Sequence, residues 1–113
     1  MRSKISSLSK NDDFKYILNG KKISNKYSTI FFRKLPNKNN NKLNISFVTK
    51  KKIGNAVIRN KIKRRLRNIM NDSVKKIKID LNYSYLFIAK KNIFDDPYEK
   101  IKEVLFVDLK KIR

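Results

Sequence analysis

The stretch KKKIGNAVIRNKIKRRLR, residues 50–67, decides how this chain folds and what it can bind. It holds nine bases and no acid in eighteen residues. From about Ala56 to Val74, apolar residues recur at steps of three and four, at Ile58, Ile62, Leu66, Ile69 and Met70. This spacing predicts an amphipathic helix that buries one stripe of side chains against the rest of the protein.

The other side of the predicted helix is basic. At about 100° per residue, the side away from the apolar stripe carries Lys61, Lys63, Arg64 and Arg67, while Arg59 and Arg65 flank the stripe. Gly54 and Asn55 precede the helix, where asparagine is a good N-cap and free backbone N–H groups suit a phosphate. A merely soluble helix face does not require the exclusion of every acid, so the pattern favours contact with RNA or DNA.

The chain as a whole is strongly basic. It has 30 Lys and Arg residues against 9 Asp and Glu residues, no histidine, and a formal net charge of +21 at pH 7. Such a charge on a small domain points to a polyanionic partner, because phosphates relieve its self-repulsion. Lysine, isoleucine and asparagine are also abundant, with 23, 15 and 14 copies, which an AT-rich genome would produce unaided. The placement of the bases therefore carries more weight than their number.

The remaining patterns predict one α+β domain over residues 1–113, because this length suits a single core. We expect a short helix at residues 11–20, closed by a glycine, and strands at residues 27–35, 43–49 and 83–89. The last of these strands is apolar on both faces, which is typical of a central strand.

Two connections are also predicted. The Asn-rich segment 36–42 has turn residues and nothing to bury, so we expect a solvated hairpin loop between the strands that flank it. Near the C-terminus, Asp96 is expected to cap a last helix that has Pro97 at its first position and Glu99 at the capping-box position.

The side chains offer little for catalysis. Histidine and cysteine are absent, and most of the nine acids fall at helix starts, where the helix dipole explains them. We therefore expect no catalytic residue and no metal site on the protein. No apolar run approaches the ~20 residues of a membrane span, so we expect a cytoplasmic protein, with neither a membrane nor a small-molecule substrate among its partners.

Aromatic residues near the N-terminus form a second group of interest. Phe14 lies on the first predicted helix, and Phe31 and Phe32 lie on the first predicted strand. For any one of them the core is the simpler explanation. A strand alternates its faces, so Phe31 and Phe32 cannot both be buried on the same side. One of the two is a candidate for stacking on an unpaired base.

Residues 51–67, KKIGNAVIRNKIKRRLR, resemble the signature of the protein subunit of bacterial ribonuclease P, K-x-G-N-A-V-x-R-N-R-x-K-R-x-x-R. The order of the predicted elements fits that family along essentially the whole chain. The resemblance implies an αβββαβα sandwich with a small mixed sheet and a left-handed crossover between parallel strands at the basic helix. It also implies a fourth strand, from division of the region 21–35.

The resemblance further implies a function. In this family a large RNA subunit, with bound Mg²⁺, performs the hydrolysis that removes the 5′ leader from precursor tRNA, and the protein assists by binding both RNAs. The residues implied to contact the catalytic RNA are Lys51, Lys52, Asn55, Arg59, Asn60, Lys61, Lys63, Arg64 and Arg67. Those implied to line a cleft for the single-stranded leader, between the first helix and the sheet, are Phe14, Leu18 and Phe31.

The chain departs from the family pattern at two of these positions. Lys61 stands where an arginine is usual, so the charge remains but a two-bond grip on phosphate does not. Leu18 stands where relatives commonly carry an aromatic residue, which leaves Phe14 and Phe31 as the better candidates for stacking. Two alternatives stay open: a ribosomal or other structural RNA-binding protein without a role in tRNA maturation, and a nuclease that acts without an RNA subunit.

Overall fold

The computed structural model describes residues 5–7, 11–35, 42–77 and 79–112. Along the chain it has β1 (Ile5–Ser7), α1 (Asn11–Leu18), β2 (Lys21–Ser24), β3 (Ser28–Lys34), β4 (Leu43–Val48), the 3₁₀ helix η1 (Lys51–Ile53), α2 (Ala56–Lys76), β5 (Tyr83–Ala89), α3 (Asn92–Asp95) and α4 (Tyr98–Lys111). None of the helices in this described part is long and apolar enough to cross a membrane.

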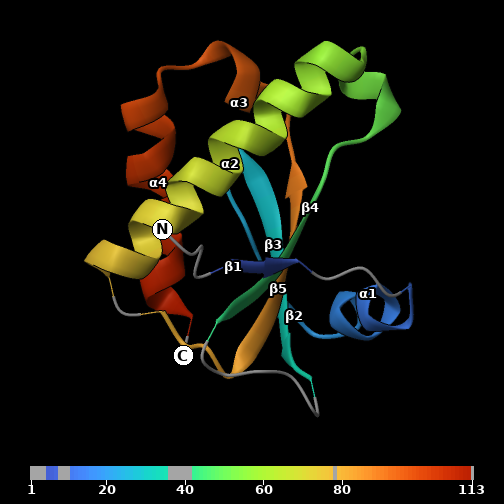
Figure 1. Cartoon of the computed structure of the whole chain (residues 1–113), viewed down its shortest axis with the longest axis vertical. Coiled ribbons are helices and arrows are strands. Elements are labelled where there is room, and N and C mark those ends of the chain that lie inside the picture. The colour runs from blue at the N-terminus through green and yellow to red at the C-terminus, as the bar shows by residue number, and fades with distance from the viewer. Residues whose placement is uncertain (1–4, 8–10, 36–41, 78, 113) are drawn as a thin grey trace.

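The strands form one mixed sheet in the order β1-β4-β5-β3-β2. β4 runs parallel to β5 and to the short β1, whereas β3 is antiparallel to both β5 and β2. The long helix α2 makes the crossover between the parallel strands β4 and β5 (Figure 1). The mixed α+β fold is thus confirmed, while the left-handed sense of the crossover stays a prediction from the resemblance.

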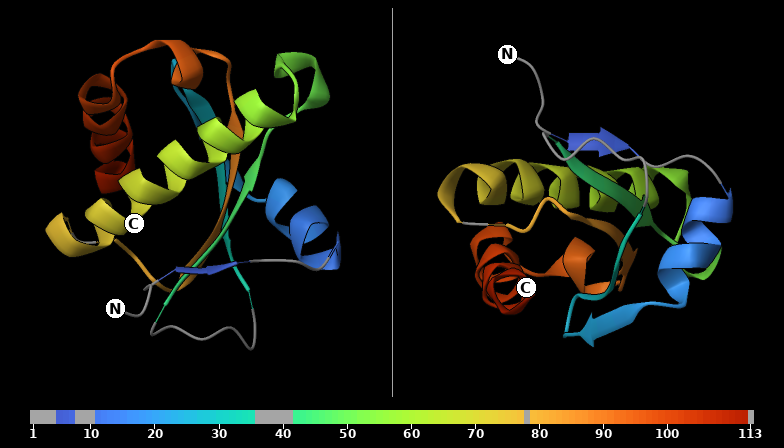
Figure 2. Two further views of the ribbon diagram at one scale, coloured as in Figure 1. Left: turned by 45° about the horizontal axis from the view of Figure 1, so that its top comes forward. Right: turned by 90° about the horizontal axis from the view of Figure 1, so that it is seen from below.

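The two faces of the sheet are covered differently. Helices α2, α3 and α4 pack on one face, which we call the covered face, and its buried side chains include Ile30, Phe32, Ile45, Tyr85 and Phe87. On the opposite side, which we call the open face, α1 is the helix that contacts the strands. Figure 2 shows α1 across the sheet from α2 and α4. Phe31 and Leu86 belong to this second, smaller cluster.

The strand predictions are confirmed in part. The region 21–35 divides into β2 and β3, as the resemblance implied, and β5 is the central strand expected from its apolar pattern. The predicted hairpin is wrong, because β5 lies between β3 and β4 and pairs with both. Residues 36–41 of the connection lie outside the described residues. The three-residue β1 and the four-residue α3 were not predicted.

The predicted cap of the last helix is wrong by one residue. Pro97 is the N-cap of α4, and no side chain caps the helix there. The carboxylate of Asp96 is used elsewhere: Oδ2 accepts a hydrogen bond from the hydroxyl of Tyr27 at 2.6 Å and lies 3.3 Å from Nζ of Lys26. The carboxylate of Asp96 therefore makes tertiary contacts with Tyr27 and Lys26 and does not cap α4.

The glycine expected to close the first helix does so and also makes a close contact with β3. The helix ends at Leu18, and the backbone N–H of Gly20 donates to the carbonyl of Ile17 at 2.9 Å. A Cβ at Gly20 would lie 2.7 Å from the carbonyl oxygen of Phe32. Glycine is required here because the backbone passes so close to β3, which fixes α1 on the open face.

Candidate nucleic-acid interface

The basic helix α2 begins at a side-chain cap. Asn55 is the N-cap, and its Oδ1 accepts a hydrogen bond from the backbone N–H of Ile58 at 3.0 Å. This confirms the predicted cap and satisfies one of the N–H groups that a helix start leaves unpaired. The preceding Gly54 is extended, and a Cβ there would lie only 3.0 to 3.1 Å from the side chain of Ile58.

The two sides of α2 are separated as the periodicity predicts. The stripe residues Ile62, Leu66, Ile69 and Met70 are fully buried under the sheet. The four bases predicted to point outward are exposed, namely Lys61, Lys63, Arg64 and Arg67. Asn60 is exposed as well, and so are Lys51, Lys52 and Asn55 before and at the helix start. Arg59 is half-buried, and its Nε is buried without a hydrogen-bond partner.

No acid neutralises these bases. Residues 14–71 contain seventeen bases and no acid. Among the described residues, no base between 50 and 67 makes an ion pair; the ion pairs lie elsewhere and involve Lys26, Lys102 and Lys111. The cations of α2 from Arg59 to Arg67 therefore occupy about 12 Å of helix with their field uncompensated, which attracts and holds a polyanion.

Two bases of α2 have contacts inside the protein. Nζ of Lys61 lies 4.9 Å from the centre of the Phe94 ring, while the side chain itself stays exposed. Arg65 turns inward, and its Nη1 donates to the carbonyl oxygens of Ile93 at 2.9 Å and Asp96 at 2.8 Å. Arg65 was predicted only to flank the apolar stripe, and its inward bonds depend on α3, which the sequence did not reveal.

The structure brings two of the three predicted cleft residues together. Phe14 of α1 and Phe31 of β3 are both half-buried and pack in the open-face cluster with Ile17 and Leu86. Leu18 is not part of this cluster and is 43% exposed. Phe32 is buried on the covered face, so Phe31 and Phe32 lie on opposite faces, as strand alternation predicts.

A groove of about 410 Å³ extends the open face toward the C-terminal ends of β4 and β5. We call it the end groove; its lining residues are Thr29, Lys50, Lys52, Ile53, Ile88, Ala89, Lys90 and Lys91. Thr29 and Ile88 pair across β3 and β5, two residues along from the pair formed by Phe31 and Leu86, and so share their face. The end groove therefore combines four lysines with an apolar floor.

Sequence reasoning missed most of these lysines. Lys90 and Lys91 follow directly on a predicted strand, and Lys50 follows another, but only the parallel pairing of β4 with β5 brings the strand ends together. Lys22 was missed as well, and its Nζ lies 5.9 Å from the centre of the Phe31 ring. The available signal was a basic residue placed just after each apolar strand.

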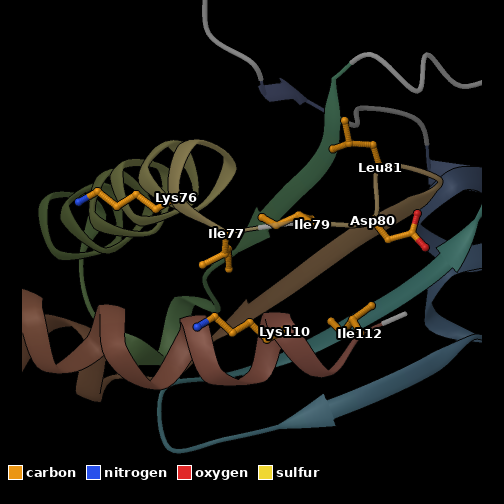
Figure 3. A pocket seen from close by; sticks show the side chains of 7 residues that line it. All are labelled: Lys76, Ile77, Ile79, Asp80, Leu81, Lys110 and Ile112. Atoms are coloured by element: carbon orange, nitrogen blue, oxygen red, sulfur yellow. The ribbon is translucent and has the colours of Figure 1, made fainter.

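A second cavity, of about 930 Å³, lies at the far end of α2 (Figure 3). Its lining is mainly aliphatic, formed by Ile77, Ile79, Leu81 and Ile112 together with Lys76, Asp80 and Lys110. Figure 3 shows these side chains between the last turns of α2 and α4 and the segment before β5. None of the residues predicted to bind RNA or leader lines it, so it is separate from the basic interface.

The acids of the described residues do not fit a metal site. No group of three or more acids that could hold a metal ion occurs in this part of the chain. Asp96 is bonded to Tyr27 and Lys26, and Asp72 lies 3.5 Å from Nζ of Lys102. These carboxylates are engaged in contacts that support the fold.

A small mixed sheet, a long helix with uncompensated cations and an aromatic cluster beside a lysine-lined groove are together typical of a small protein that binds nucleic acid. The comparisons with known proteins then fix the family. The Ribonuclease P family model matches residues 3–113, and the chain belongs to the ribonuclease P protein family.

Relatives of known name support this assignment. The chain is 38% identical to the ribonuclease P protein component of Fusobacterium nucleatum over 109 residues, covering 89% of this chain and 91% of that protein. It is 30% identical to the same component of Mycoplasma capricolum over 106 residues, covering 94% of each.

Solved structures give the same result. The ribonuclease P protein of Thermotoga maritima has a TM-score of 0.80 at 27% identity, over 96% of this chain and 98% of that one. The protein from Staphylococcus aureus has a TM-score of 0.75 at 29% identity, over 94% and 93%. The resemblance noted from residues 51–67 is thereby confirmed. Family members are protein subunits of an endoribonuclease that acts in tRNA processing with an RNA subunit, and this chain takes that role.

Proposed function

We propose that the exposed bases of α2 hold the sugar-phosphate backbone of the catalytic RNA, and that the open face receives the single-stranded 5′ leader of precursor tRNA. The binding of the catalytic RNA by α2 is supported above all by the array of cations between residues 50 and 67. Among the described residues, these cations have no acidic partner. A rigid helix presents this array, since its opposite stripe is fully buried.

The proposed RNA contacts are polar residues of η1 and of the first half of α2 with its N-cap, all of them exposed except the half-buried Arg59. Arg64 and Arg67 can each grip a phosphate with two bonds, whereas Lys63 acts as a point charge. The full proposed set is Lys51, Lys52, Asn55, Arg59, Asn60, Lys61, Lys63, Arg64 and Arg67.

The proposed physical role is to bring two polyanions together. Ribozyme and precursor tRNA repel each other, and a protein of net charge +21 between them lowers that repulsion. It also favours the retention of divalent ions by the two RNAs. Mg²⁺ is assigned to the RNA subunit, because the acids of the described residues form no cluster that would hold it. The hydrolysis is assigned to that RNA as well, and the site of action to the cytoplasm.

The leader cleft is proposed on the open face. Proteins that bind single strands combine aromatic platforms with a cationic groove, and here the half-buried rings of Phe14 and Phe31 lead to the lysines of the end groove. Leu18 is exposed beside this cluster and offers an apolar wall without a stacking surface.

The direct test is reconstitution with a bacterial ribonuclease P RNA at low Mg²⁺, with and without this protein. We expect the protein to stimulate leader removal from precursor tRNA. If about 6 to 8 phosphates are neutralised, log affinity for the RNA subunit should fall with log salt at a slope near −4 to −6. A nearly flat salt dependence would reject the electrostatic role of α2.

Two pairs of variants separate the surfaces. Arg64→Ala should weaken binding to the RNA subunit and make the salt slope shallower by about 0.7, whereas Lys110→Ala, which removes a charge beside the far cavity, should leave binding nearly unchanged. Phe14→Ala should weaken the binding of precursor tRNA more than that of mature tRNA, and it should leave binding of the protein to the RNA subunit unchanged. The control is Phe106→Ala, which changes a half-buried phenylalanine on α4. It should not alter the preference of the holoenzyme for precursor over mature tRNA.

The same experiments decide the alternatives. Association with ribosomes and no effect on leader removal would indicate a structural RNA-binding protein. One solved Staphylococcus aureus relative is described as a mutant with defective mRNA degradation activity. Incubation of the purified chain, free of RNA subunit, with precursor tRNA therefore belongs in the test. Cleavage there would place the chemistry on the polypeptide and overturn the proposal.

A further inference from the structure

Arg65 differs from every other arginine of the basic helix in its hydrogen bonds. Its Nη1 donates to the carbonyl oxygens of Ile93 and Asp96, at 2.9 Å and 2.8 Å. These carbonyls belong to the end of α3 and the bend before α4, where helix ends leave acceptors unpaired. Bonds from a charged donor are stronger than neutral ones, so Arg65 holds this bend against α2.

The bend is in turn tied to the turn between β2 and β3. The carboxylate of Asp96 accepts from the hydroxyl of Tyr27 at 2.6 Å. The carbonyl of Tyr27 accepts from the backbone N–H of Lys90 at 2.8 Å. Four residues are thus joined in series by hydrogen bonds, from Arg65 on α2 to Lys90 in the end groove.

Chain connectivity reinforces this link. α3 follows directly on Lys90 and Lys91, so the segment that Arg65 grips is the continuation of the segment that carries two of the groove's lysines. The side chain of Lys90 is itself held, because its Nζ donates to the carbonyl of Asn25 at 2.6 Å and to the hydroxyl of Ser24 at 3.3 Å.

We propose that Arg65 is a positioning residue that sets the end groove relative to the RNA-binding side of α2, through Asp96 and Tyr27. The inference rests on the proposed function, in which α2 faces the RNA subunit and the end groove faces the leader. Arg65 then contacts neither RNA. It fixes the distance between the two surfaces, so that a leader can enter the groove while α2 is bound to the ribozyme.

Adjacent arginines give a matched comparison. In reconstituted holoenzyme, Arg65→Met should bind the RNA subunit within twofold of the unaltered protein, with an unchanged salt slope, yet lose at least fivefold in its preference for precursor over mature tRNA. Arg64→Met should show the opposite pattern, a shallower slope and an unchanged preference. Arg65→Lys, which keeps a charged donor on a shorter reach, should recover part of the preference.

A second variant breaks the series without touching α2. Tyr27→Phe removes the hydroxyl that donates to Asp96. Like Arg65→Met, it should lower the preference for precursor over mature tRNA. This variant keeps the proposal testable if Arg65→Met folds poorly. Hydrogen exchange on the RNA-free protein gives a readout that does not depend on catalysis. In both variants the Lys90 amide should exchange at least tenfold faster, while the Ile58 amide beside the Asn55 cap should be unchanged.

The outcomes are distinct. If Arg65→Met lowers only the melting temperature, with leader preference and Lys90 exchange unchanged below it, Arg65 is merely structural and the proposal is overturned. If it makes the salt slope shallower as Arg64→Met does, Arg65 contacts phosphate and the proposal is likewise overturned. If the unaltered protein shows no leader preference at all, the proposed function fails, and Lys90 exchange alone then decides whether Arg65 positions the groove.

Discussion

The two faces of the sheet differ in how completely their apolar side chains are sealed. On the covered face, Tyr85 and Phe87 are fully buried beneath three helices. On the open face, α1 leaves Phe31 half-buried beside a lysine-lined groove. Burial removes apolar area from water and stabilises the fold, whereas a partly exposed ring keeps surface for a ligand. The comparison separates residues that hold this protein together from residues free to bind.

The largest effect should come from the covered face. Phe87→Ala removes a fully buried ring that also meets Phe47 edge-on at 5.8 Å, and should lower the free energy of unfolding by about 3 to 5 kcal/mol. Phe31→Ala should cost less, because part of its ring already contacts water. Urea unfolding of both variants measures the difference, and equal losses would show that the two faces are sealed alike.

A smaller effect is expected where α1 meets β3. Gly20→Ala places a Cβ 2.7 Å from the backbone oxygen of Phe32, so α1 must shift, at a cost of about 1 to 3 kcal/mol. In Gly54→Ala the nearest atoms belong to Ile58 and lie at 3.0 to 3.1 Å, so a smaller displacement relieves the contact and the loss should be smaller. Thermal unfolding of the two variants compares them, and the reverse order would contradict a tight contact on the open face.

The start of α2 provides a third test, on the covered side. Asn55→Ala removes the acceptor for the Ile58 N–H and should lower stability by about 1 kcal/mol. Asn68→Ala, an exposed position in the middle of the same helix, should cost nothing, because alanine favours the helix. Chemical denaturation checks both. Equal behaviour of the two variants would mean that the side chain of Asn55 does not cap the helix.

The smallest effect concerns alkaline pH and the side chain of Tyr27. Its hydrogen bond to Asp96, with burial, raises the pKa of Tyr27 to about 12, and the same bond lowers the pKa of Asp96. In the unfolded chain a tyrosine has a pKa of about 10. Above that pH the unfolded state binds fewer protons than the folded state, so stability should fall as pH rises toward 12. Tyr27→Phe should remove part of this fall, measured as unfolding midpoints between pH 9 and 12; an unchanged profile would exclude Tyr27 as its source.

Much of the fold follows from local sequence patterns. The strand predicted at 83–89 has the bounds of β5, and the helix predicted from Ala56 begins at that residue in α2. The order of the strands does not follow, because the pairing of β5 with β3 and β4 depends on contacts between distant segments. The same limit explains the misplaced cap, since the carboxylate of Asp96 bonds to Tyr27 rather than to its own helix.

The candidate site shows the same division. Helical periodicity was enough to place Arg64 and Arg67 on the exposed side of α2. Phe14 and Phe31, which the family resemblance assigned to one cleft, both pack against the open-face cluster, whereas Leu18 lies outside that cluster. Whether these residues touch RNA stays a prediction. The lysines of the end groove could not be assembled from the sequence, because parallel pairing of two strands brings them together.

The central place of β5 has a consequence for how the protein is made. Its residue Ala89 pairs with Ser28 of β3, and β5 is synthesised after the other described strands of the sheet. Contacts this far apart along the chain slow folding, because a long loop must close before they form. A nascent chain that stops before Tyr83 holds the whole basic segment but lacks the strand that joins β3 to β4. The polypeptide therefore completes this sheet only after residue 89 has been synthesised.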